Sequence, residues 1–542
     1  MSGASILALE IMNSRTLAPY YGNSLFVWGS LIGVVLTGLS LGYYYGGKKA
    51  DLNPSYVAFS TLIFVAGIYV FITTIGSTTI FLVVLASRLG ERFGPLLASI
   101  LLLGVPSILL GMVSPYAIRI STKEIGSVGK TAGNLYAIST MGSIAGTFIT
   151  VFILIPEAPL TTNLYAVSII LITVSLVGLS SRRKGLAAIA LAGSIALIMS
   201  PPAPVPGVLE QRDTMYHRIV VWDDTVTGVR TLLLDNNFHS AMDLRDPERV
   251  VYLYTGFFNI GFAYNPDVKE VLFIGGGGFS GPKQFLRDYE DVSIDVVEID
   301  PDVVDIAKKY FMVENNERMT IYVEDGRTYL IGTDKKYDLI VLDAYAKTYV
   351  PFHLMTKEFH QLTISHLNDN GVLVSNVITA LEGDASNLFR SEILTMKEVY
   401  PNMDVYKVSA TAPPSFVQNL IVVATKSPKL ITTEKLFTNS KDLVKAVDVN
   451  YMINSKYYDT IDTSRVSVLL DNYAPVENLL NPMTGMQYVK EVITNKEELV
   501  QELQTVPPPT ETIELNPFSN SILIVGIIVG SIILIRSRAR NL

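Results

Sequence analysis

Cysteine is absent from the 542-residue chain, and histidine occurs only five times. The absence of cysteine excludes disulfides, cysteine nucleophiles and thiolate metal ligands together. The histidines show neither an HExxH motif nor a paired spacing, so we expect no metal centre. Charged side chains are also scarce, at 17% of residues against about 25% in ordinary soluble proteins. The net charge of −8 and the lack of a long basic block argue against nucleic acid as a partner.

Apolar residues make up 49% of the chain, and the mean hydropathy is +0.36. The first part of the chain contains apolar runs separated by short polar loops, and several approach the roughly 20 residues that a membrane-spanning helix needs. These runs are residues 25–45, 56–74, 96–118, 135–155, 164–180 and 186–199. Residues 1–17 form a short first span or a re-entrant segment, and residues 522–535 form a final span. The sequence therefore predicts a multi-span α-helical membrane domain over residues 1–200, a C-terminal span over residues 519–536, and membrane lipid as a partner.

Small residues recur at a spacing of four within these runs, at Gly38 and Gly42 and again at Gly142 and Gly146. This spacing lets helices approach each other closely. We interpret it as helix packing rather than as the lining of a channel. A cluster of four prolines, from Pro201 to Pro206, then predicts a stiff linker over residues 201–212.

A buried-strand pattern at residues 269–274 runs directly into the turn Gly275-Gly276-Gly277-Gly278, and a helical pattern follows at residues 282–289. Such a turn lets a ligand approach the backbone closely and points amide N–H groups at it. A second strand, at residues 292–297, ends in Glu298-Ile299-Asp300. An acid about twenty residues beyond the glycines suits hydrogen bonds to ribose hydroxyls. We therefore expect these glycines, Glu298 and Asp300 to bind a nucleoside.

Two further predicted strands end in carboxylates. Residues 319–323 lead into Glu324, Asp325 and Gly326, and residues 336–342 lead into Asp343. Helical patterns at residues 302–310 and 356–367 and a strand pattern at 371–377 continue the alternation. Ligands of open α/β sheets bind at the carboxyl ends of the strands, although acids there can also serve as helix caps. A nicotinamide dinucleotide would explain the glycines and Glu298 but not the Asp-Gly pair, so we disfavour it.

These motifs resemble the spermidine synthases, or polyamine aminopropyltransferases, a branch of the class I methyltransferase fold, in their membrane-fused form. The polar region carries the resemblance in GGGGFSG, VVEIDPDVVDIAKKYF, VEDGRTYL, YDLIVLDAY and LLLDNNFHSAMDL. The apolar region carries it in LEIMNSRTLAPYYGNS, LTGLSLGYYYGGKKAD and NLYAISTMGSIAGTFITVFILIP. The resemblance implies a small N-terminal β-region at residues 213–260, a Rossmann-like α/β domain at 261–480 and a linker at 481–518.

The family joins an aminopropyl group from decarboxylated S-adenosylmethionine to an amine. The resemblance implies that Gly275 to Gly277 contact the nucleoside, that Glu298 binds its ribose, and that Asp325 with Gly326 binds the adenine. It implies that Asp343 is catalytic, because it matches the family's acid that accepts a proton or orients the attacking amine. Candidates for lining the substrate pocket are His217, His239, Tyr252, Tyr254 and Tyr345.

Three positions depart from the family's pattern. Gly278 and Ala346 stand where the family usually has aspartates, and its Tyr-Gln/His-Glu element reads Tyr252-Leu253-Tyr254. The nucleoside half of the site is therefore kept, while the acidic half that holds a polycation is depleted. We expect a small-molecule amine other than ordinary putrescine as the acceptor.

Three interpretations remain at this stage. The leading one is a membrane-anchored aminopropyltransferase with an altered acceptor. The second is a methyltransferase that uses S-adenosylmethionine itself on an amine or a membrane-associated acceptor. The third is a non-catalytic scaffold or transport accessory that keeps the fold. The sequence leaves a homo-oligomer open.

Basic residues collect at four places: Lys48 and Lys49; Arg119, Lys123 and Lys130; Arg182, Arg183 and Lys184; and Arg536, Arg538 and Arg540. The positive-inside rule places such clusters in the cytoplasm. With the predicted spans, all four fall on one side, which puts the large polar domain on the extracytoplasmic side of the cell membrane. A second span at residues 76–92 would reverse this assignment, and a cytoplasmic nucleoside would also favour the reverse. We expect the polar domain outside.

Overall fold

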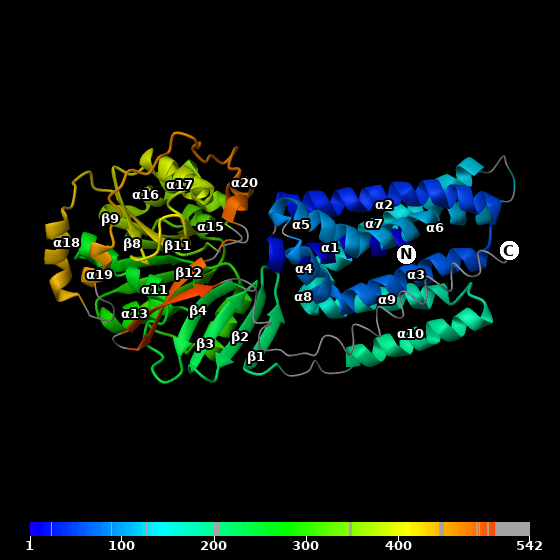
Figure 1. Ribbon diagram of the computed structural model, residues 1–542, viewed down its shortest axis with the longest axis horizontal. Coiled ribbons are helices and arrows are strands. Elements are labelled where there is room, and N and C mark those ends of the chain that lie inside the picture. The colour runs from blue at the N-terminus through cyan, green and yellow to red at the C-terminus, as the bar shows by residue number, and fades with distance from the viewer. Residues whose placement is uncertain are drawn as a thin grey trace.

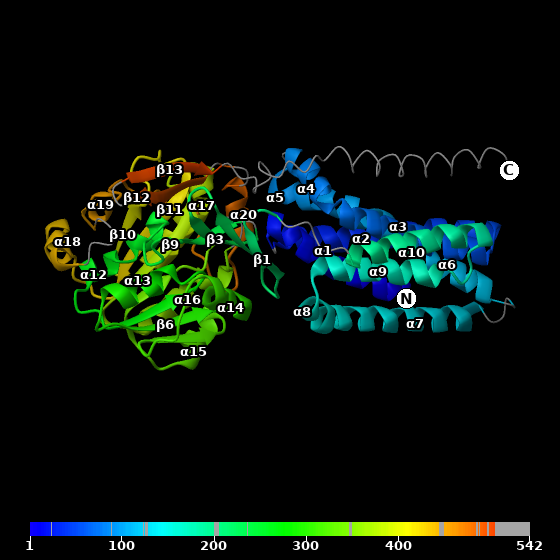
Figure 2. The same cartoon turned by 90° about the horizontal axis from the view of Figure 1, so that it is seen from below.

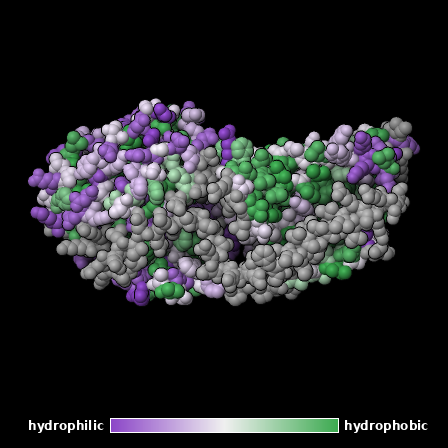
Figure 3. All heavy atoms as spheres, in the orientation of Figure 1, coloured by the Kyte–Doolittle hydropathy of each residue, from purple (hydrophilic) through white to green (hydrophobic). Residues whose placement is uncertain are grey.

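The computed structural model describes residues 1–22, 24–87, 89–122, 124, 128–199, 205–235, 237–345, 350–443, 449–483, 486, 488–495 and 498–504. A bundle of long helices lies beside an α/β body, with the two arranged end to end along the long axis (Figure 1). Apolar residues gather on the bundle in the view of Figure 3, whereas the α/β body is mostly hydrophilic there. This difference matches the two compositional regions of the sequence.

The bundle is built from helices that follow the predicted apolar runs. They are α1 (Ser2–Tyr21), α2 (Leu25–Leu52), α3 (Tyr56–Ile75), α4 (Ser77–Ala86), α5 (Gly90–Ser99), α6 (Val105–Ser121), α7 (Val128–Ile149), α8 (Ile155–Glu157), α9 (Leu160–Ser175) and α10 (Ser181–Met199). Short π-helical turns at Ile100–Gly104 and Thr150–Leu154 make α5–α6 and α7–α8 continuous. Among the described residues, four stretches are long and apolar enough to cross a membrane: Leu25–Leu52, Tyr56–Ile75, Arg92–Ser121 and Val128–Glu157. The predicted final span at residues 522–535 lies outside the described residues.

Small residues bring pairs of these helices together, as their spacing predicts. A methyl group added at Gly38 would lie 2.6 Å from Cβ of Ser107, so α2 and α6 are in direct contact there. A methyl group at Gly146 would lie 2.6 Å from the carbonyl oxygen of Ala4, so α7 packs closely on α1. Glycine is therefore required at both positions for the observed distance between helices.

Helices α2 and α6 end, and α7 and α10 begin, at the end of the bundle far from the α/β body (Figures 1 and 2). The described basic residues of these segments therefore lie at that end. Arg119, near the end of α6, pairs with Asp51, near the end of α2, over 3.3 Å. Arg183, near the start of α10, donates a hydrogen bond of 2.7 Å to Thr61 of α3. The described residues between 76 and 92 form the ten-residue helix α4 and the start of α5. A helix of ten residues is shorter than the roughly 20 that a span needs.

Hydrogen bonds from α1 and α9 contribute to the contact between the bundle and the α/β body. The guanidinium of Arg15 on α1 donates a hydrogen bond to the carbonyl oxygen of Met215. The amide of Leu160 at the start of α9 donates to Oδ2 of Asp213 over 3.3 Å. Met215 and Asp213 belong to the first hairpin of the α/β body, which therefore rests directly on the bundle.

The α/β body contains two sheets. Strands β1 (Val208–Asp213), β2 (Arg218–Asp224), β3 (Val229–Leu234) and β4 (Asn237–Asp243) form an antiparallel sheet in chain order. The main sheet contains β5 (Glu270–Ile274), β6 (Ser293–Glu298), β7 (Met319–Val323), β8 (Tyr337–Leu342), β9 (Leu367–Thr379), β10 (Asn402–Lys407), β11 (Val417–Thr425), β12 (Tyr488–Asn495) and β13 (Glu498–Gln504). Its order is β13-β12-β11-β9-β8-β5-β6-β7, with β10 beside β11. The strands β8, β5, β6 and β7 are parallel.

Helices cover both faces of the main sheet (Figures 1 and 2). They are α11 (Leu253–Phe257), α12 (Ile260–Tyr264), α13 (Ser280–Asp288), α14 (Pro301–Tyr310), α15 (Gly326–Gly332), α16 (Lys357–Ser365), α17 (Asn387–Lys397), α18 (Thr433–Asn439), α19 (Val449–Asn454) and α20 (Val476–Leu480). Alternate residues of β5 and β8 enter two separate cores, one on each face. The chain runs from β5 to β6 and β7 on one side of β5 and then crosses to β8 on the other side. The boundary between β5 and β8 is therefore the switch point at which ligands of such folds bind.

Two predicted linkers contain regular structure. Strand β1 begins at Val208, inside the predicted linker at residues 201–212. Strands β12 and β13 lie within residues 481–518 and extend the main sheet. The sequence did not predict β12 and β13, because their Lys, Glu and Gln residues have a low intrinsic preference for strands.

Candidate functional site

The glycine turn after β5 has a backbone that only glycine adopts without strain. Gly275 has φ +100° and Gly277 has φ +49°. A methyl group at Gly275 would overlap the carbonyl oxygen of Asp343. The turn is thus pressed against the end of β8, which brings Asp343 beside the glycines although the two are far apart in sequence.

Glu298, at the end of β6, lies under the glycine turn. Its Oε2 accepts hydrogen bonds from the amides of Gly276 and Gly277 over 2.9 and 3.2 Å, and its Oε1 accepts from the amide of Asp300 over 3.1 Å. A carboxylate offers about four acceptor positions. Three are used within the protein, so the group retains capacity for one more donor.

Asp300 has a structural role in this arrangement. Its Oδ1 accepts from the amide of Asp302 over 3.0 Å as the N-cap of α14, and its Oδ2 accepts from the hydroxyl of Thr214 over 2.5 Å. The side chain is fully buried. Both oxygens therefore help to hold the first hairpin against α14.

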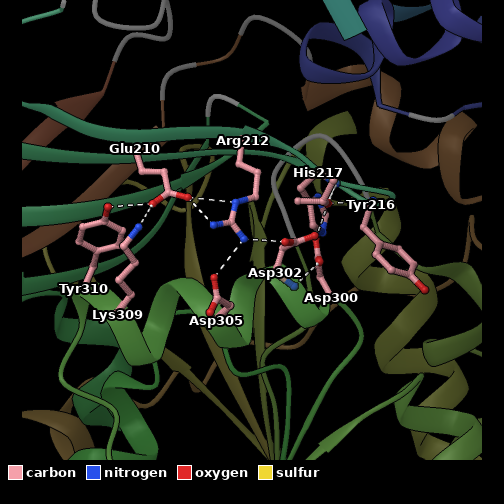
Figure 4. A network of polar contacts seen from close by, with 10 residues as sticks. Glu210, Arg212, Tyr216, His217, Asp300, Asp302, Asp305, Lys309 and Tyr310 are labelled. Carbon is pink, nitrogen blue, oxygen red and sulfur yellow. Dashed lines mark hydrogen bonds and ion pairs between the residues drawn. The ribbon is translucent and has the colours of Figure 1, made fainter. Parts of the chain in front are cut away.

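An ion-pair network fixes β1 to α14 and so positions this hairpin (Figure 4). Arg212 contacts Glu210, Asp302 and Asp305, with 2.7 Å from Nη1 to Oδ1 of Asp302. Lys309 pairs with Glu210 over 2.6 Å, and Tyr310 donates to the same carboxylate over 2.8 Å. Burial opposes ionisation of Glu210, but these donors outweigh it and lower its pKa to about 2.

His217 lies in the turn of the same hairpin, directly before β2. Its Nδ1 lies 2.9 Å from Oδ2 of Asp235. Burial by itself lowers the pKa of His217, but the hydrogen bond and charge of Asp235 outweigh it, and the pKa is raised overall. Glu298 and Asp300 add to this effect, which places His217 near the carboxylates at the end of β6.

Asp325 caps α15, where its Oδ1 accepts from the amides of Arg327 and Thr328 over 3.1 and 3.0 Å. Its Oδ2 lies 2.8 Å from Nε2 of His353. Burial opposes ionisation of Asp325, but the bonds from His353 and Thr328 outweigh it and lower its pKa to about 2. Gly326 packs against Ile274 of β5, where a side chain would not fit.

Asp343 is the end of a row of hydrogen-bonded side chains that crosses the sheet. Nδ2 of Asn376 donates to Oδ1 of Asp343 over 2.8 Å, and Nδ2 of Asn419 donates to Oδ1 of Asn376 over 2.8 Å. The hydroxyl of Tyr488 donates to Oδ1 of Asn419. Burial raises the pKa of Asp343 to about 6, with the bond from Asn376 opposing the rise and the charge of Glu298 adding to it.

The predicted substrate residues divide into two groups. Tyr252 and Tyr254 stack with ring centres 6.2 Å apart, and the hydroxyl of Tyr254 donates to the carbonyl oxygen of His239 over 2.8 Å. Burial lowers the pKa of His239 to about 4. Tyr345 packs in the core on the opposite face of the main sheet from these two tyrosines and donates to the carbonyl oxygen of Leu354 over 2.9 Å. The structure therefore does not bring Tyr345 together with the others.

Of the two positions where the family usually has an aspartate, the structure describes only Gly278. The amide of Gly278 donates to the hydroxyl of Ser240 over 2.8 Å, and a methyl group at Gly278 would lie 2.7 Å from Cβ of Ser240. An acid cannot be accommodated there without displacing β4. Ala346 lies outside the described residues.

Sequence reasoning missed several polar residues of the site. His353, Asn376, Asn419, Tyr488 and Lys490 all contact predicted site residues or continue the row from Asp343. Asn376 and Asn419 had a signal, because each is a polar residue within an otherwise apolar strand. Within the described ranges, no group of three or more His, Asp or Glu side chains is arranged to hold a metal ion.

The α/β body is similar in sequence to known aminopropyltransferases. The family model for the spermine/spermidine synthase domain matches residues 257–435. A polyamine aminopropyltransferase of Vibrio vulnificus is 32% identical over 252 residues, which cover 42% of this chain and 84% of that protein. Another from Alkaliphilus metalliredigens is 30% identical over 207 residues, covering 37% of this chain and 69% of that protein. A solved structure of a probable spermidine synthase from Corynebacterium glutamicum aligns with 50% of this chain and 99% of its own, at 17% identity and a TM-score of 0.41.

Proposed function

Because this chain belongs to the spermidine synthase family of polyamine aminopropyltransferases, we propose that it transfers an aminopropyl group from decarboxylated S-adenosylmethionine to an amine. The observation that carries the proposal is the position of Asp343. It directly follows β8 at the switch point of the sheet, against Gly275, and its half-buried carboxyl group accepts a hydrogen bond from Asn376.

The residues around the glycine turn fit a nucleoside. The turn leaves no side chain between the backbone and a ligand at Gly275, Gly276 and Gly277, and Glu298 retains acceptor capacity for a ribose hydroxyl. Asp325 with Gly326 is proposed to bind the adenine, sharing its Oδ2 with His353. Decarboxylated S-adenosylmethionine, when bound, supplies an aminopropyl carbon activated by a sulfonium.

The chemistry assigned to Asp343 follows from its surroundings. An amine is protonated near neutral pH and becomes a nucleophile only after losing its proton. A carboxylate whose pKa is raised to about 6 is mostly ionised at neutral pH and still basic enough to accept that proton. Asp343 is therefore proposed to bind the incoming ammonium and to take up its proton.

We further propose that the helix bundle anchors this transferase in the cell membrane, with the α/β body on the extracytoplasmic side. Four described helical stretches have the length and apolar composition of spans. The described basic residues at the far end of the bundle support a cytoplasmic assignment for that end.

A non-catalytic scaffold or transport accessory is the second candidate, and one observation favours it. The family usually has an acid at the position of Gly278. Ser240 lies so close to Gly278 that a larger side chain does not fit there. A site that has lost a contact for a diamine in this way is expected to bind putrescine weakly, since an ammonium buried without a carboxylate partner is costly.

The test uses the full-length protein purified in detergent. Decarboxylated S-adenosylmethionine and a panel of amines are supplied, and release of methylthioadenosine is followed by chromatography. We expect release that Asp343→Asn abolishes and that the exposed control Asp369→Asn leaves unchanged. Substituting S-adenosylmethionine for the donor tests the methyltransferase interpretation, which would be supported by release of S-adenosylhomocysteine.

Binding is measured separately by calorimetry with methylthioadenosine. Glu298→Ala removes a charged contact worth about 1.5–3 kcal/mol and should weaken binding roughly 10- to 150-fold. Binding of methylthioadenosine without release from any amine would support the scaffold interpretation. A folded protein that binds no adenosine compound would contradict the proposed function.

A further inference from the structure

His353 contacts Asp325, the acid that is proposed to bind the adenine. It lies in the short 3-10 helix Phe352–Leu354, in the connection between β8 and α16. Its Nε2 is 2.8 Å from Oδ2 of Asp325, and the two side chains are 33% and 24% exposed. The pair is therefore held within the protein and is still open to a ligand.

The two oxygens of Asp325 are used unequally. Oδ1 accepts from the amides of Arg327 and Thr328 over 3.1 and 3.0 Å, and from the hydroxyl of Thr328 over 3.3 Å. Among the described residues, Oδ2 accepts only from His353. Each oxygen of a carboxylate offers about two acceptor positions. The first turn of α15 fills Oδ1, so a ligand that donates to Asp325 meets a vacant position at Oδ2, next to His353.

The direction of the bond between His353 and Asp325 follows from the charge of the acid. The hydrogen bonds at Asp325 outweigh the effect of burial and lower its pKa to about 2. The carboxylate is therefore ionised at neutral pH and can only accept hydrogen bonds. Nε2 of His353 is the donor, and it occupies one of the two acceptor positions of Oδ2.

The backbone around His353 is fixed by two further contacts. Nη1 of Arg327 donates to the carbonyl oxygen of His353 over 3.1 Å, and the same guanidinium pairs with Asp471 over 2.5 Å. The hydroxyl of Tyr345 donates to the carbonyl oxygen of Leu354 over 2.9 Å. A residue that orients another group has to be held by contacts of its own, and His353 meets this condition.

We propose that His353 is a positioning residue for recognition of the base. By holding Oδ2 of Asp325, it directs the remaining acceptor position of that oxygen at the 6-amino group of adenine. This inference rests on the proposed function and specifies how the site selects its nucleoside. A purine with a 6-oxo group would place one acceptor against another, with no donor between them. The site therefore selects 6-amino purines.

The experiment compares two nucleosides that differ at position 6 of the purine. Full-length protein in detergent is titrated by calorimetry with methylthioadenosine and with methylthioinosine. The variants are His353→Ala, His353→Gln, which keeps an N–H donor, and the matched control His366→Ala. Nε2 of His366 lies 3.0 Å from the carbonyl oxygen of Thr333, directly after α15. His366 therefore contacts the other end of the same helix, away from the acid.

We expect the unmodified protein to bind methylthioadenosine at least about 10-fold more tightly than methylthioinosine, as for a hydrogen bond to a charged group. His353→Ala should reduce this ratio by about 5-fold. The reason is that water in place of the imidazole can donate to a 6-oxo group as well as to Oδ2. His353→Gln and His366→Ala should keep the ratio.

A pH series distinguishes positioning from a general loss of packing. Asp325 accepts most strongly when it is ionised, and loss of the bond from His353 raises its pKa above about 2. On acidification, binding of methylthioadenosine by His353→Ala should therefore weaken at a higher pH than binding by the unmodified protein or by His366→Ala. The other charged groups next to the pair are the same in all variants: Arg327, Asp471 and Glu358.

Two results would overturn the inference and leave the proposed function standing. One is equal affinity of the unmodified protein for the two nucleosides. The other is a ratio and an acid limb that do not change in His353→Ala. If this variant does not fold, His353→Phe takes its place, because it keeps an aromatic ring and removes the donor.

The same titrations identify failure of the proposed function. A folded protein that binds neither nucleoside would contradict the proposed function, and the inference with it. A protein that binds methylthioadenosine but transfers no aminopropyl group would contradict transfer alone. The ratio of the two affinities in His353→Ala then still decides whether His353 positions the acid.

Discussion

Asn376 and Asn368 lie on the same strand, β9, and the side-chain amide of each donates a hydrogen bond to an aspartate on, or directly after, the neighbouring strand β8. Asn376 bonds Asp343 over 2.8 Å at the carboxyl end of the strand, and Asn368 bonds Asp338 over 2.7 Å at the opposite end. The two bonds have the same chemistry, but only the first lies at the proposed site. Substituting each asparagine in turn therefore distinguishes an effect on the proposed site from a general effect on the stability of the sheet.

Asn376→Ala should shift the pH dependence of transfer. The bond from Asn376 holds the pKa of Asp343 below the value that burial alone would give. Its removal should raise that pKa further above about 6, by about 1–2 units for a bond to a charged group. The acid limb of kcat/KM should therefore move to higher pH. Asn368→Ala should lower the melting temperature without moving this limb, and equal shifts in both variants would contradict the assignment.

Gly275→Ala should abolish nucleoside binding and lower the melting temperature. The substitution forces a side chain into a left-handed conformation and against the carbonyl of Asp343, at a cost of about 1–3 kcal/mol. Gly332→Ala is the matched control, since no atom lies within 4 Å of the position of its added methyl group. Calorimetry with methylthioadenosine should separate the two variants. Retained binding in Gly275→Ala would show that the turn does not contact the ligand.

Glu392 should make the protein less stable as pH rises. It is fully buried on α17, and burial raises its pKa from 4.5 to about 8. A raised pKa in an acid means that the folded state favours the protonated form, so stability is greatest below about pH 4.5 and is lost as pH rises to about 8. At 1.36 kcal/mol per unit this amounts to at most about 5 kcal/mol.

The measurement is the melting temperature of the full-length protein between pH 5 and pH 9. We expect the unmodified protein to lose stability over this range and Glu392→Gln to lose less. Glu398→Gln, an exposed carboxylate next to the same helix, should behave like the unmodified protein. Identical pH curves for all three proteins would show that Glu392 is ionised at neutral pH.

The absence of cysteine makes membrane sidedness directly testable. Val226→Cys places a thiol on the α/β body at a position that is 92% exposed, and Leu52→Cys places one at the far end of the bundle at a position that is 82% exposed. A maleimide that cannot cross membranes should label Val226→Cys in intact cells and Leu52→Cys only after permeabilisation. The reverse pattern would place the α/β body in the cytoplasm.

The sequence predicted the central part of the α/β fold well because its signals are local. The apolar strands β5, β6, β7 and β8 each lead into a glycine or a carboxylate, and both the strands and the turn lie where the pattern places them. The order of these strands in the sheet was not visible in the sequence. It depends on contacts between distant segments, such as that between Gly275 and Asp343.

The polar environment of the site was harder to predict, since partners matter more than residue types. Asp300 and Glu298 are both acids at the end of β6, yet Asp300 caps α14 and accepts from Thr214, whereas Glu298 supports the glycine turn. Lys490 belonged to a charged segment with the composition of a linker. Only the pairing of β12 with β11 brings it next to Tyr252.

The row from Tyr488 to Asp343 also determines how a proton can leave the site. Every donor in the row points toward Asp343, and two of its members are amides, which at neutral pH neither gain nor lose protons as hydroxyl or imidazole groups do. The row therefore stabilises the carboxylate but cannot conduct a proton away through the protein. If Asp343 takes up a proton as proposed, that proton therefore leaves the carboxylate in a direction other than along this row.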